Sequence, residues 1–261
     1  ESGDDIMVQG ESVMRNEGML GFDWAIFKGM PLPGHADMNI KIFTTVELDI
    51  LRNRFDRVEA LSGWDNNDTL IGDSRVAPTG PFVPNIPVNE QTMEGDELNR
   101  EGVERITDFH KLFGFASIDE LRSAFPNPTD IVFNEGNVLI GGGGSDTLQG
   151  NGGNDILDGD AWLNVRIGIT ATINGEVVEI GTAERMQGAI TIYEQYRDLL
   201  NTKSPLPDDT YGDLHGRPLD QVMFTRELNP GDLKIVREVL WADGEGSIDV
   251  AVFRGHFSEY E

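Results

Sequence analysis

Residues 141–158 read Gly-Gly-Gly-Gly-Ser-Asp-Thr-Leu-Gln and then Gly-Asn-Gly-Gly-Asn-Asp-Ile-Leu-Asp. The stretch divides into two nine-residue units in the same phase, and the residues that coincide are Gly141 with Gly150, Gly144 with Gly153, Asp146 with Asp155, and Leu148 with Leu157. A short fixed period of this kind is typical of a solenoid, in which turns and short strands are stacked coil upon coil. We therefore expect this stretch to lie at the centre of a parallel β-structure.

The composition of the nine-residue unit indicates how it folds. Its first six positions form a turn, because glycine there permits positive φ and the close approach of neighbouring coils. Such a turn leaves main-chain carbonyl groups free to face a cation, and the Asp at the sixth position adds a carboxylate. Calcium takes about six to eight oxygen ligands of this mixed kind. The aliphatic residue at the eighth position points inward, and coils must stack because one coil cannot bury it alone.

Less complete copies of the unit occur elsewhere in the chain. Their sixth positions are occupied by Asp5, Asp68, Asn137 and Asp249. Because Asn137 carries no charge, we expect its turn to hold calcium less strongly than a turn with Asp. Each interruption between copies leaves from a repeat and returns to one. Loop-closure entropy grows slowly with length, so one roll with insertions is expected; several independent miniature rolls are the alternative.

The expected fold is α+β and mainly β: a short parallel β-roll interrupted by three inserted lobes that contain helices and a β-hairpin. The expected roll segments are about 2–10, 57–73, 132–160 and 244–261, and the expected lobes are about 11–56, 74–131 and 161–243, all in one composite domain of residues 1–261.

Local signals predict several elements within the lobes. Asn174-Gly175 lies between two apolar stretches and predicts a type I′ hairpin. Ser117 with Glu120 forms a capping box and predicts the start of a short helix. Thr182 is expected to begin a further helix that runs to Leu200.

The overall composition restricts the classes of function. The chain has 261 residues and a formal net charge of −26, so we expect no binding to nucleic acid through charge. The absence of cysteine excludes disulfides, thiolate catalysis and zinc–thiolate sites. No apolar run approaches a membrane span, so no membrane insertion is expected, and no signal peptide is visible. The chain begins inside a repeat and is expected to be a piece of a longer protein, with neighbouring domains of the same chain as partners.

The repeats resemble the RTX (repeats-in-toxin) regions of large proteins that bacteria export by type I secretion. Gly141–Asp158 carries the resemblance most specifically, and Val58–Asp73 is similar to the degenerate repeats near the ends of such regions. Asp249–Tyr260 resembles the strand that closes them, with the pattern Asp-x-Ala-x-Phe-x-Gly-x-x-x-x-Tyr. The first 75 residues and Asn99–Ala116 are similar to segments that accompany animal-type haem peroxidase modules in giant bacterial RTX proteins.

This resemblance implies that Ca²⁺ is the cofactor and that the turns hold it. The implied ligands are the carboxylates of Asp146 and Asp155 and, by repeat position, the carbonyl groups of Gly141, Gly143, Gly144, Gly150, Gly152 and Gly153. The next candidates are Asp68, Asp5, Asp249 and Asn137.

The resemblance also implies calcium-triggered folding after export. An acidic repeat chain stays unfolded where free calcium is scarce. Outside the cell, calcium that binds only the folded state adds about 4 kcal/mol per site at a thousandfold excess over its dissociation constant. The implied location is secreted, extracellular or at the bacterial cell surface.

No catalytic motif indicates an enzyme in this segment. The chain has neither His-Glu-x-x-His nor Gly-x-Ser-x-Gly, the signatures of zinc proteases and α/β-hydrolases. His110 lies near Phe109 and Phe113 and is a candidate haem ligand, but a partly buried structural histidine is the commoner case. We therefore predict a non-catalytic, calcium-binding structural or adhesive module of a secreted protein, whose enzyme activity, if any, lies elsewhere.

The alternative is a ligand-binding accessory domain of a secreted peroxidase-like enzyme. The lobes would then form a concave apolar pocket with convergent polar groups, for an extracellular carbohydrate, a peptide or protein, or haem. Trp64, Trp162 and Trp241 each lie beside a repeat junction. They form either a carbohydrate-binding face or the packing at these junctions, and we favour packing.

Overall fold

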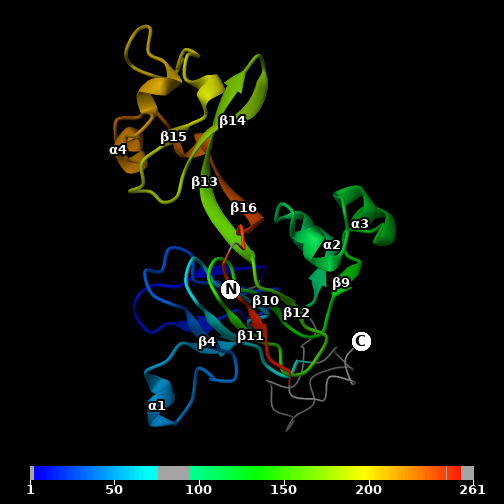
Figure 1. The fold of residues 1–261 in the computed structure, drawn as a ribbon. Helices are drawn as coiled ribbons and strands as arrows, with labels where there is room; N and C mark the ends of the chain where they lie inside the picture. The colour runs from blue at the N-terminus through cyan, green and yellow to red at the C-terminus, as the bar shows by residue number, and fades with distance from the viewer. Residues whose placement is uncertain (1–2, 76–94, 245, 254–261) are drawn as a thin grey trace. The chain divides into compact units, whose positions relative to one another are not determined.

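The protein is described by a computed structural model that covers residues 3–75, 95–244 and 246–253. The sequence predicts one composite domain, and the structure divides the chain into two compact units (Figure 1). The roll unit contains the residues up to 163 and those from 238 onward, and the hairpin unit contains residues 164–237.

The roll unit contains two parallel sheets of short strands. The first has the order β1 (Ile6–Val8), β3 (Trp24–Ile26), β6 (Ala60–Ser62), β10 (Val138–Ile140) and β12 (Ile156–Asp158). The second has the order β17 (Val250–Ala251), β11 (Thr147–Gln149), β7 (Thr69–Ile71) and β4 (His35–Asp37). From β3 onward the chain alternates between the sheets, so each of these coils contributes one strand to each. The predicted mainly-β fold with a parallel β-roll is confirmed.

The strand register stacks the eighth-position residues of successive coils. Across the first sheet the aligned residues are Met7, Ala25, Leu61, Leu139 and Leu157. Across the second they are Ala36, Leu70, Leu148 and Ala251. Most of these side chains are buried in one hydrophobic cluster together with Phe27, Met38 and Phe55. Because each strand has at most three residues here, burial of its central side chain is the main stabilisation of a coil, roughly 1.5–3 kcal/mol for a large aliphatic residue.

Much of the expected lobe at 11–56 belongs to the roll. It contains β3 and β4, which pair with β6 and β7. Strands β1, β2 (Arg15–Glu17) and β3 begin nine residues apart, at residues 6, 15 and 24. The excursion is therefore smaller than expected, and within it lie α1 (Glu47–Ile50) and β5 (Arg54–Asp56), which pairs with β2. The period was hidden because apolar residues occupy turn positions that carry glycine or polar residues in the clear repeats.

The excursion after β7 forms a small lobe with short helices. Its described elements are β8 (Leu98–Asn99), α2 (Arg100–Glu104), the 3-10 helix η2 (Phe109–Phe113), α3 (Ile118–Ala124) and β9 (Ile131–Phe133). The predicted helix start is confirmed, because the Ser117 side chain accepts the Glu120 N–H at the start of α3. The reciprocal half of the capping box differs, since Glu120 Oε2 accepts the N–H of Ala116 over 2.8 Å. Phe109 packs against Trp24 of β3 with ring centroids 5.5 Å apart, which attaches the lobe to the roll. The Pro-rich stretch 77–87 lies outside the described residues.

The hairpin unit contains most of an antiparallel sheet. Its order is β15 (Thr191–Ile192), β14 (Glu176–Ala183), β13 (Ala161–Ile173) and β16 (Leu233–Trp241). The other elements are the 3-10 helices η3 (Glu194–Tyr196), η4 (Tyr211–Leu214) and η5 (Pro230–Asp232), and α4 (Leu219–Phe224). Asn174 and Gly175 have φ of 54° and 89° and join β13 to β14, which confirms the predicted hairpin.

The helix predicted from Thr182 to Leu200 is wrong. Thr182 lies in β14 opposite Gly168, and its hydroxyl donates to Ile167 O. Ile190 and Ile192 are both buried, and this two-residue spacing fits a strand. The apolar residues that suggested a helical face are thus shared among a strand, a loop and one 3-10 turn.

Candidate calcium-binding turns

The sixth turn positions form two rows, one leading into each sheet of the roll. The residues that immediately precede strands of the first sheet are Asp5, Asp23, Glu59, Asn137 and Asp155. Those that precede strands of the second sheet are Gly34, Asp68, Asp146 and Asp249. Every sixth-position residue predicted from the sequence is therefore in one of these rows. Asp146 and Asp155 are in different rows, so the two clearest repeats do not share one site.

Hydrogen bonds connect each row from coil to coil. Asp146 Oδ1 accepts the Asp68 N–H over 2.6 Å, and Asp249 Oδ1 accepts the Asp146 N–H over 2.8 Å. In the other row, Asp155 Oδ1 accepts the Asn137 N–H over 2.7 Å. One carboxylate oxygen is thus used to hold the preceding coil, and the other faces its own turn.

Asp146 has the environment expected of a cation ligand. It is 1% exposed, and its Oδ2 has no hydrogen-bond partner in the described part of the chain. Burial raises the pKa of Asp146 to about 7, and the negative charges of Asp68 and Asp249 add to this rise, although the hydrogen bond from Asp68 opposes it. A buried carboxylate is costly unless it is protonated or paired with a positive charge. A calcium ion bound at Oδ2 would supply that charge, so the residues present fit the ion.

The turn around Asp146 stacks directly on the turn at residues 63–68. Gly143 N donates to Trp64 O over 2.6 Å, and Ser145 N donates to Asn67 Oδ1 over 2.9 Å. Within the turn, Gly142 and Gly144 have φ of 101° and 121°, which glycine adopts without strain. The glycines are therefore required by the backbone of the stacked turns.

Main-chain oxygens converge on the same space as the carboxylates. A Cβ built at Gly141 would lie 2.3 Å from Asp146 Oδ2 and 2.6 Å from Gly159 O. A Cβ built at Gly63 would lie 2.1 Å from Gly141 O and 2.3 Å from Asp68 Oδ2. No group of three or more His, Asp or Glu side chains that suits a metal ion occurs among the described residues. An ion in these turns would therefore depend on carbonyl groups as well as carboxylates.

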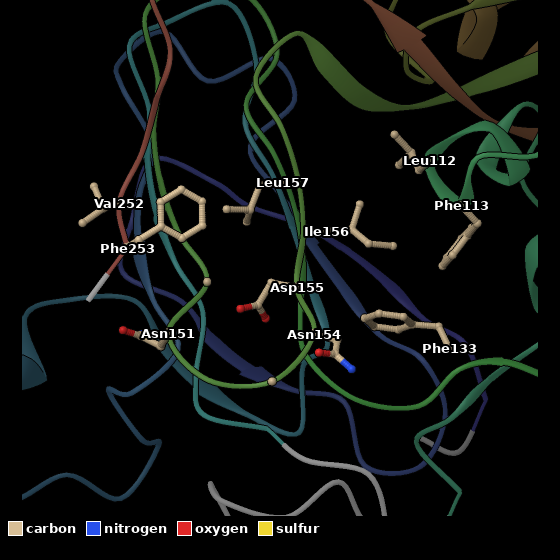
Figure 2. A pocket seen from close by; sticks show the side chains of 12 residues that line it. Leu112, Phe113, Phe133, Asn151, Asn154, Asp155, Ile156, Leu157, Val252 and Phe253 are labelled. Carbon is tan, nitrogen blue, oxygen red and sulfur yellow. The ribbon is translucent and has the colours of Figure 1, made fainter. Parts of the chain in front are cut away.

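Asp155 lies in the last described turn of the first row, at residues 150–155. Burial raises its pKa to about 6, with an opposing hydrogen bond from Asn137 N–H and a further rise from the charge of Asp73. Figure 2 shows Asp155 within the loop of its turn, between Asn151 and Asn154. This turn borders a cavity of about 720 Å³ that is also lined by Phe113, Phe133 and Phe253. Gly152 and Gly153 stack on the turn that begins at Gly72, against Ser74 and Arg75.

The Asn137 side chain is occupied by hydrogen bonds. Its Oδ1 accepts the Asp73 N–H over 2.9 Å, and its Nδ2 donates to Glu59 O and Met38 Sδ, both over 3.4 Å. Asp5, at the start of the same row, donates its N–H to Asp23 Oδ1 over 2.7 Å. The Asn137 side chain thus links neighbouring coils of the row without a charged oxygen. Weaker calcium binding at this turn stays a prediction.

Asp23 is a candidate ligand that the sequence analysis missed. It is fully buried, its Oδ2 has no hydrogen-bond partner within the described ranges, and burial together with the charge of Glu59 raises its pKa to about 8. Gly18, Gly21 and Asp23 have the spacing of the first, fourth and sixth positions of the clear repeats. This spacing was the available signal, and the intervening apolar residues concealed it.

The long excursion that contains the hairpin unit departs from inside a turn. In the intact turn, Gly141 faces the carboxylate of Asp146, as described above. Gly159 faces Asp249 in the same way, because a Cβ built there would lie 2.2 Å from Asp249 Oδ2. The chain therefore leaves the roll after a first turn position and returns before a sixth, although a long excursion separates the two.

The tryptophans at the repeat junctions pack within the roll unit. Trp64 and Trp162 meet edge to face, with ring centroids 4.3 Å apart. Trp241 Nε1 donates to Asp158 Oδ2 over 3.2 Å, and Lys111 lies over its ring. Trp64 and Trp162 therefore pack against each other, whereas Trp241 is 40% exposed, and the packing role of all three stays a prediction.

Comparison with protein families gives one match. Residues 133–161, which contain β10, β11 and β12, match the RTX calcium-binding nonapeptide repeat (4 copies). This segment is an RTX repeat region. RTX nonapeptide repeats bind Ca²⁺, so Ca²⁺ is the cofactor of this segment, and the repeat is a structural element rather than a catalytic one. Proteins with RTX repeats are typically secreted.

The remaining comparisons add no relative. Neither the curated proteins nor the solved structures gave a match to the chain. Within the described residues, no helix has the length and apolar character needed to cross a membrane.

Proposed function

We propose that the chain is a structural module of a secreted protein and that bound calcium stabilises its fold. The observation that supports this most directly is the buried, unpartnered Asp146 Oδ2 between two stacked RTX turns. Calcium placed there would neutralise Asp146 and bridge the coil of residues 138–149 to its neighbours. The RTX roll would then owe part of its stability to the ion.

The proposed ligands combine both kinds of oxygen in the second row. Asp146 Oδ2 and Gly159 O face Gly141, and Asp68 Oδ2 and Gly141 O face Gly63. Gly143 and Gly144 shape the same turn, and Asp249 extends the row. Asp155, Gly150, Gly152 and Gly153 form the corresponding proposed site in the first row, with Asp5 and Asn137 as weaker members. This arrangement suits calcium, which accepts carboxylate and carbonyl oxygens in flexible geometry.

The module is proposed to fold when it meets calcium outside the cell and to display its lobes there in a structural or adhesive role. The net charge of −26 supports this, because the unbound chain repels itself and divalent ions relieve the repulsion. Calcium that binds only the folded state raises the free energy of unfolding by mass action.

The test compares wild type with Asp146→Asn. The amide retains Oδ1 as an acceptor for the Asp68 N–H but removes the charge at the position of Oδ2. We expect calorimetric titration to show fewer calcium ions per chain in the variant and a smaller rise in melting temperature with calcium. Asp119→Asn is the matched control, because Asp119 is exposed in α3. A wild-type chain that binds no calcium and melts identically in chelator would overturn the proposal.

A further inference from the structure

Arg75 occupies a turn position that carries glycine in the clear repeats. A Cβ built at Gly153 would lie 2.4 Å from Arg75 O, as one built at Gly144 would lie 2.6 Å from Asn66 O. Since Gly144 and Gly153 are the fourth residues of their turns, Arg75 is the fourth residue of the turn that begins at Gly72. The repeat pattern provides no side chain here, and arginine is the longest basic replacement.

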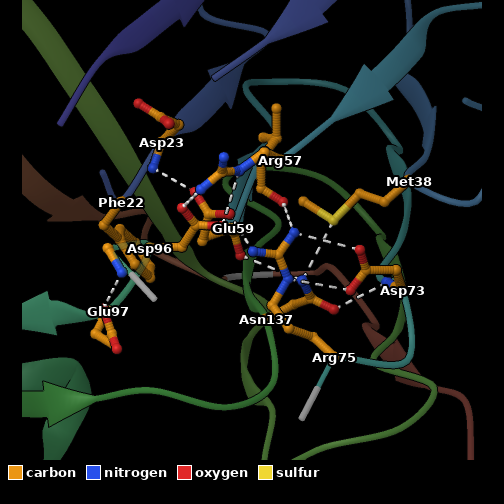
Figure 3. Close-up of polar contacts among 12 residues, drawn as sticks. Phe22, Asp23, Met38, Arg57, Glu59, Asp73, Arg75, Asp96, Glu97 and Asn137 are labelled. Atoms are coloured by element: carbon orange, nitrogen blue, oxygen red, sulfur yellow. Dashed lines mark hydrogen bonds and ion pairs between the residues drawn. The ribbon is translucent and has the colours of Figure 1, made fainter. Parts of the chain in front are cut away.

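The guanidinium of Arg75 is buried between that turn and the preceding one in the same row. Its side chain is 6% exposed. Nη1 is paired with Glu59 Oε1, Nη2 donates to Val58 O over 3.0 Å, and Nε donates to Asp73 Oδ1 over 3.3 Å. Figure 3 shows the guanidinium between Glu59 and Asp73, with Asn137 beside it.

These partners are the same kinds of oxygen that converge between the turns of the second row. Glu59 is a sixth-position carboxylate, Val58 contributes a main-chain carbonyl, and Asp73 follows the first-position Gly72. Calcium takes such a mixture of carboxylate and carbonyl oxygens. A guanidinium, with five N–H donors in one plane, also binds several oxygens at once and stays charged when buried.

The charges around Glu59 and around Asp146 differ in the way that a built-in cation predicts. Glu59 and Asp73 are balanced by Arg75 and by Lys41, whose Nζ lies 3.7 Å from Asp73 Oδ2. Asp146, in contrast, is affected most by the charges of three other acidic residues, Asp68, Asp249 and Asp160. The row with Asp146 therefore requires an external cation, and the position beside Glu59 already has one.

We propose that the Arg75 guanidinium takes the place of a calcium ion between the turn that ends at Glu59 and the turn that begins at Gly72. This position then takes up no calcium and stays paired in its absence. The inference rests on the proposed calcium function, because it assigns which positions in the roll the ion occupies. It divides the roll into positions that depend on calcium and one that does not.

The experiment counts bound calcium in wild type and in Arg75→Ala by elemental analysis after equilibration with calcium and gel filtration. Removal of the guanidinium exposes Glu59, Asp73 and Val58 O to one another. We expect the variant to hold one more calcium ion per chain than wild type. We also expect its melting temperature to fall in chelator and to recover in calcium more than that of wild type does.

Two further variants make the result decisive. Arg122→Ala is the matched control, because Arg122 also pairs with two carboxylates, Glu104 and Asp119, but its side chain is 51% exposed; its calcium count should equal that of wild type. The double variant Glu59→Gln with Arg75→Gln removes one charge of each sign and should fold without extra calcium.

The possible outcomes separate the two proposals. An Arg75→Ala chain with the calcium count and calcium-dependent melting of wild type overturns the inference. An Arg75→Ala chain that remains unfolded in calcium, while the double variant folds, also overturns it, because calcium then does not replace the guanidinium. A wild-type count of zero overturns the proposed calcium function instead, and the difference between variant and wild type still tests Arg75.

Discussion

At the scale of single residues, the two carboxylate oxygens of Asp146 and of Asp68 have different roles. In Asp146, Oδ1 holds the N–H of Asp68 in the preceding coil, and Oδ2 faces its own turn without a partner. Asp68 has the same division, but its Oδ2 accepts the Trp64 N–H over 2.8 Å. A substitution at such a position therefore has two consequences, for coil stacking and for ion binding, and Asn separates them better than Ala does.

The glycines of the same turn are not equivalent, and this leads to a prediction. Gly144 has φ of 121°, and a Cβ there would lie 2.6 Å from Asn66 O. Gly144→Ala is expected to lower the free energy of unfolding by about 1–3 kcal/mol, because alanine is strained at that φ and meets backbone that cannot move aside. Denaturant unfolding in saturating calcium measures the loss.

Gly143 provides the control for this prediction. Its nearest contact for a Cβ is Asp65 Oδ1 at 3.5 Å, an ordinary van der Waals distance, and its φ is not positive. Gly143→Ala is expected to cost clearly less than Gly144→Ala. An equal loss in free energy of unfolding from the two substitutions would show that the positive φ and close contact of Gly144 are not the reason for a glycine there.

At the scale of elements, the sequence predicts an element well where a local signal determines its geometry. It predicts poorly where apolar residues close in sequence belong to different elements. The Asn174-Gly175 hairpin was predicted correctly because the turn alone determines its geometry. The segment from Thr182 was mistaken for a helix because its apolar residues are divided among a loop, β15 and the 3-10 helix η3. In the roll, Asp23 was missed because the apolar residues Met19, Leu20 and Phe22, of which only Phe22 is buried, interrupt the turn pattern.

Strand β14 carries an ion-pair group that makes its stability depend on pH. Glu179 Oε1 accepts from Tyr193 and from Arg166, each over 2.6 Å, and Lys234 Nζ lies 2.9 Å from Oε2. Burial alone would raise the pKa of Glu179, but these hydrogen bonds outweigh burial and lower the pKa to about 2.

The sign of the pH effect follows from this lowered pKa. Because the folded-state pKa of Glu179 is below its ordinary value of 4.5, the carboxylate stabilises the fold above pH 4.5, and this contribution is lost as the pH falls toward about 2. We expect Glu179→Gln to flatten the decline of melting temperature in this range, followed by circular dichroism. Glu176→Gln, at an exposed position of the same strand, should retain the wild-type slope, and identical slopes in all three proteins would contradict the prediction.

At the scale of the whole molecule, the repeats were sufficient to predict the roll, but not the folds of the segments inserted between them. Gly141–Asp158 was sufficient to predict parallel stacking and the Ca²⁺ cofactor, because both depend on a local period. It was not sufficient to show that Asp146 and Asp155 belong to different rows, since that depends on how nine-residue units alternate between two sheets. Arg75 was also beyond prediction, because its role depends on Glu59, which comes from another coil.

The positions of the aromatic residues allow calcium effects to be assigned to one unit. All four tryptophans, Trp24, Trp64, Trp162 and Trp241, are in the roll unit. We expect calcium to raise the midpoint of thermal unfolding followed by tryptophan fluorescence, because the ion binds only folded turns, by an amount equivalent to about 4 kcal/mol per site at a thousandfold excess over its dissociation constant. A tryptophan transition with the same midpoint in calcium and in chelator would be incompatible with a roll that calcium stabilises.

The hydrogen bonds along each row give the solenoid a polarity. Asp249 Oδ1 accepts the N–H of Asp146, and Asp146 Oδ1 accepts that of Asp68, so these carboxylate acceptors belong to the later coil of each pair. Shortening the roll from its C-terminal side removes these carboxylate acceptors and leaves the N–H groups of the preceding turn without them. Shortening it from the N-terminal side frees the carboxylates of the next coil, and it also removes main-chain acceptors such as Asp68 O, which accepts the Thr147 N–H over 2.9 Å. In a chain that emerges N-terminus first, the turn N–H groups of each coil would therefore gain their carboxylate acceptors only when the next coil folds onto it.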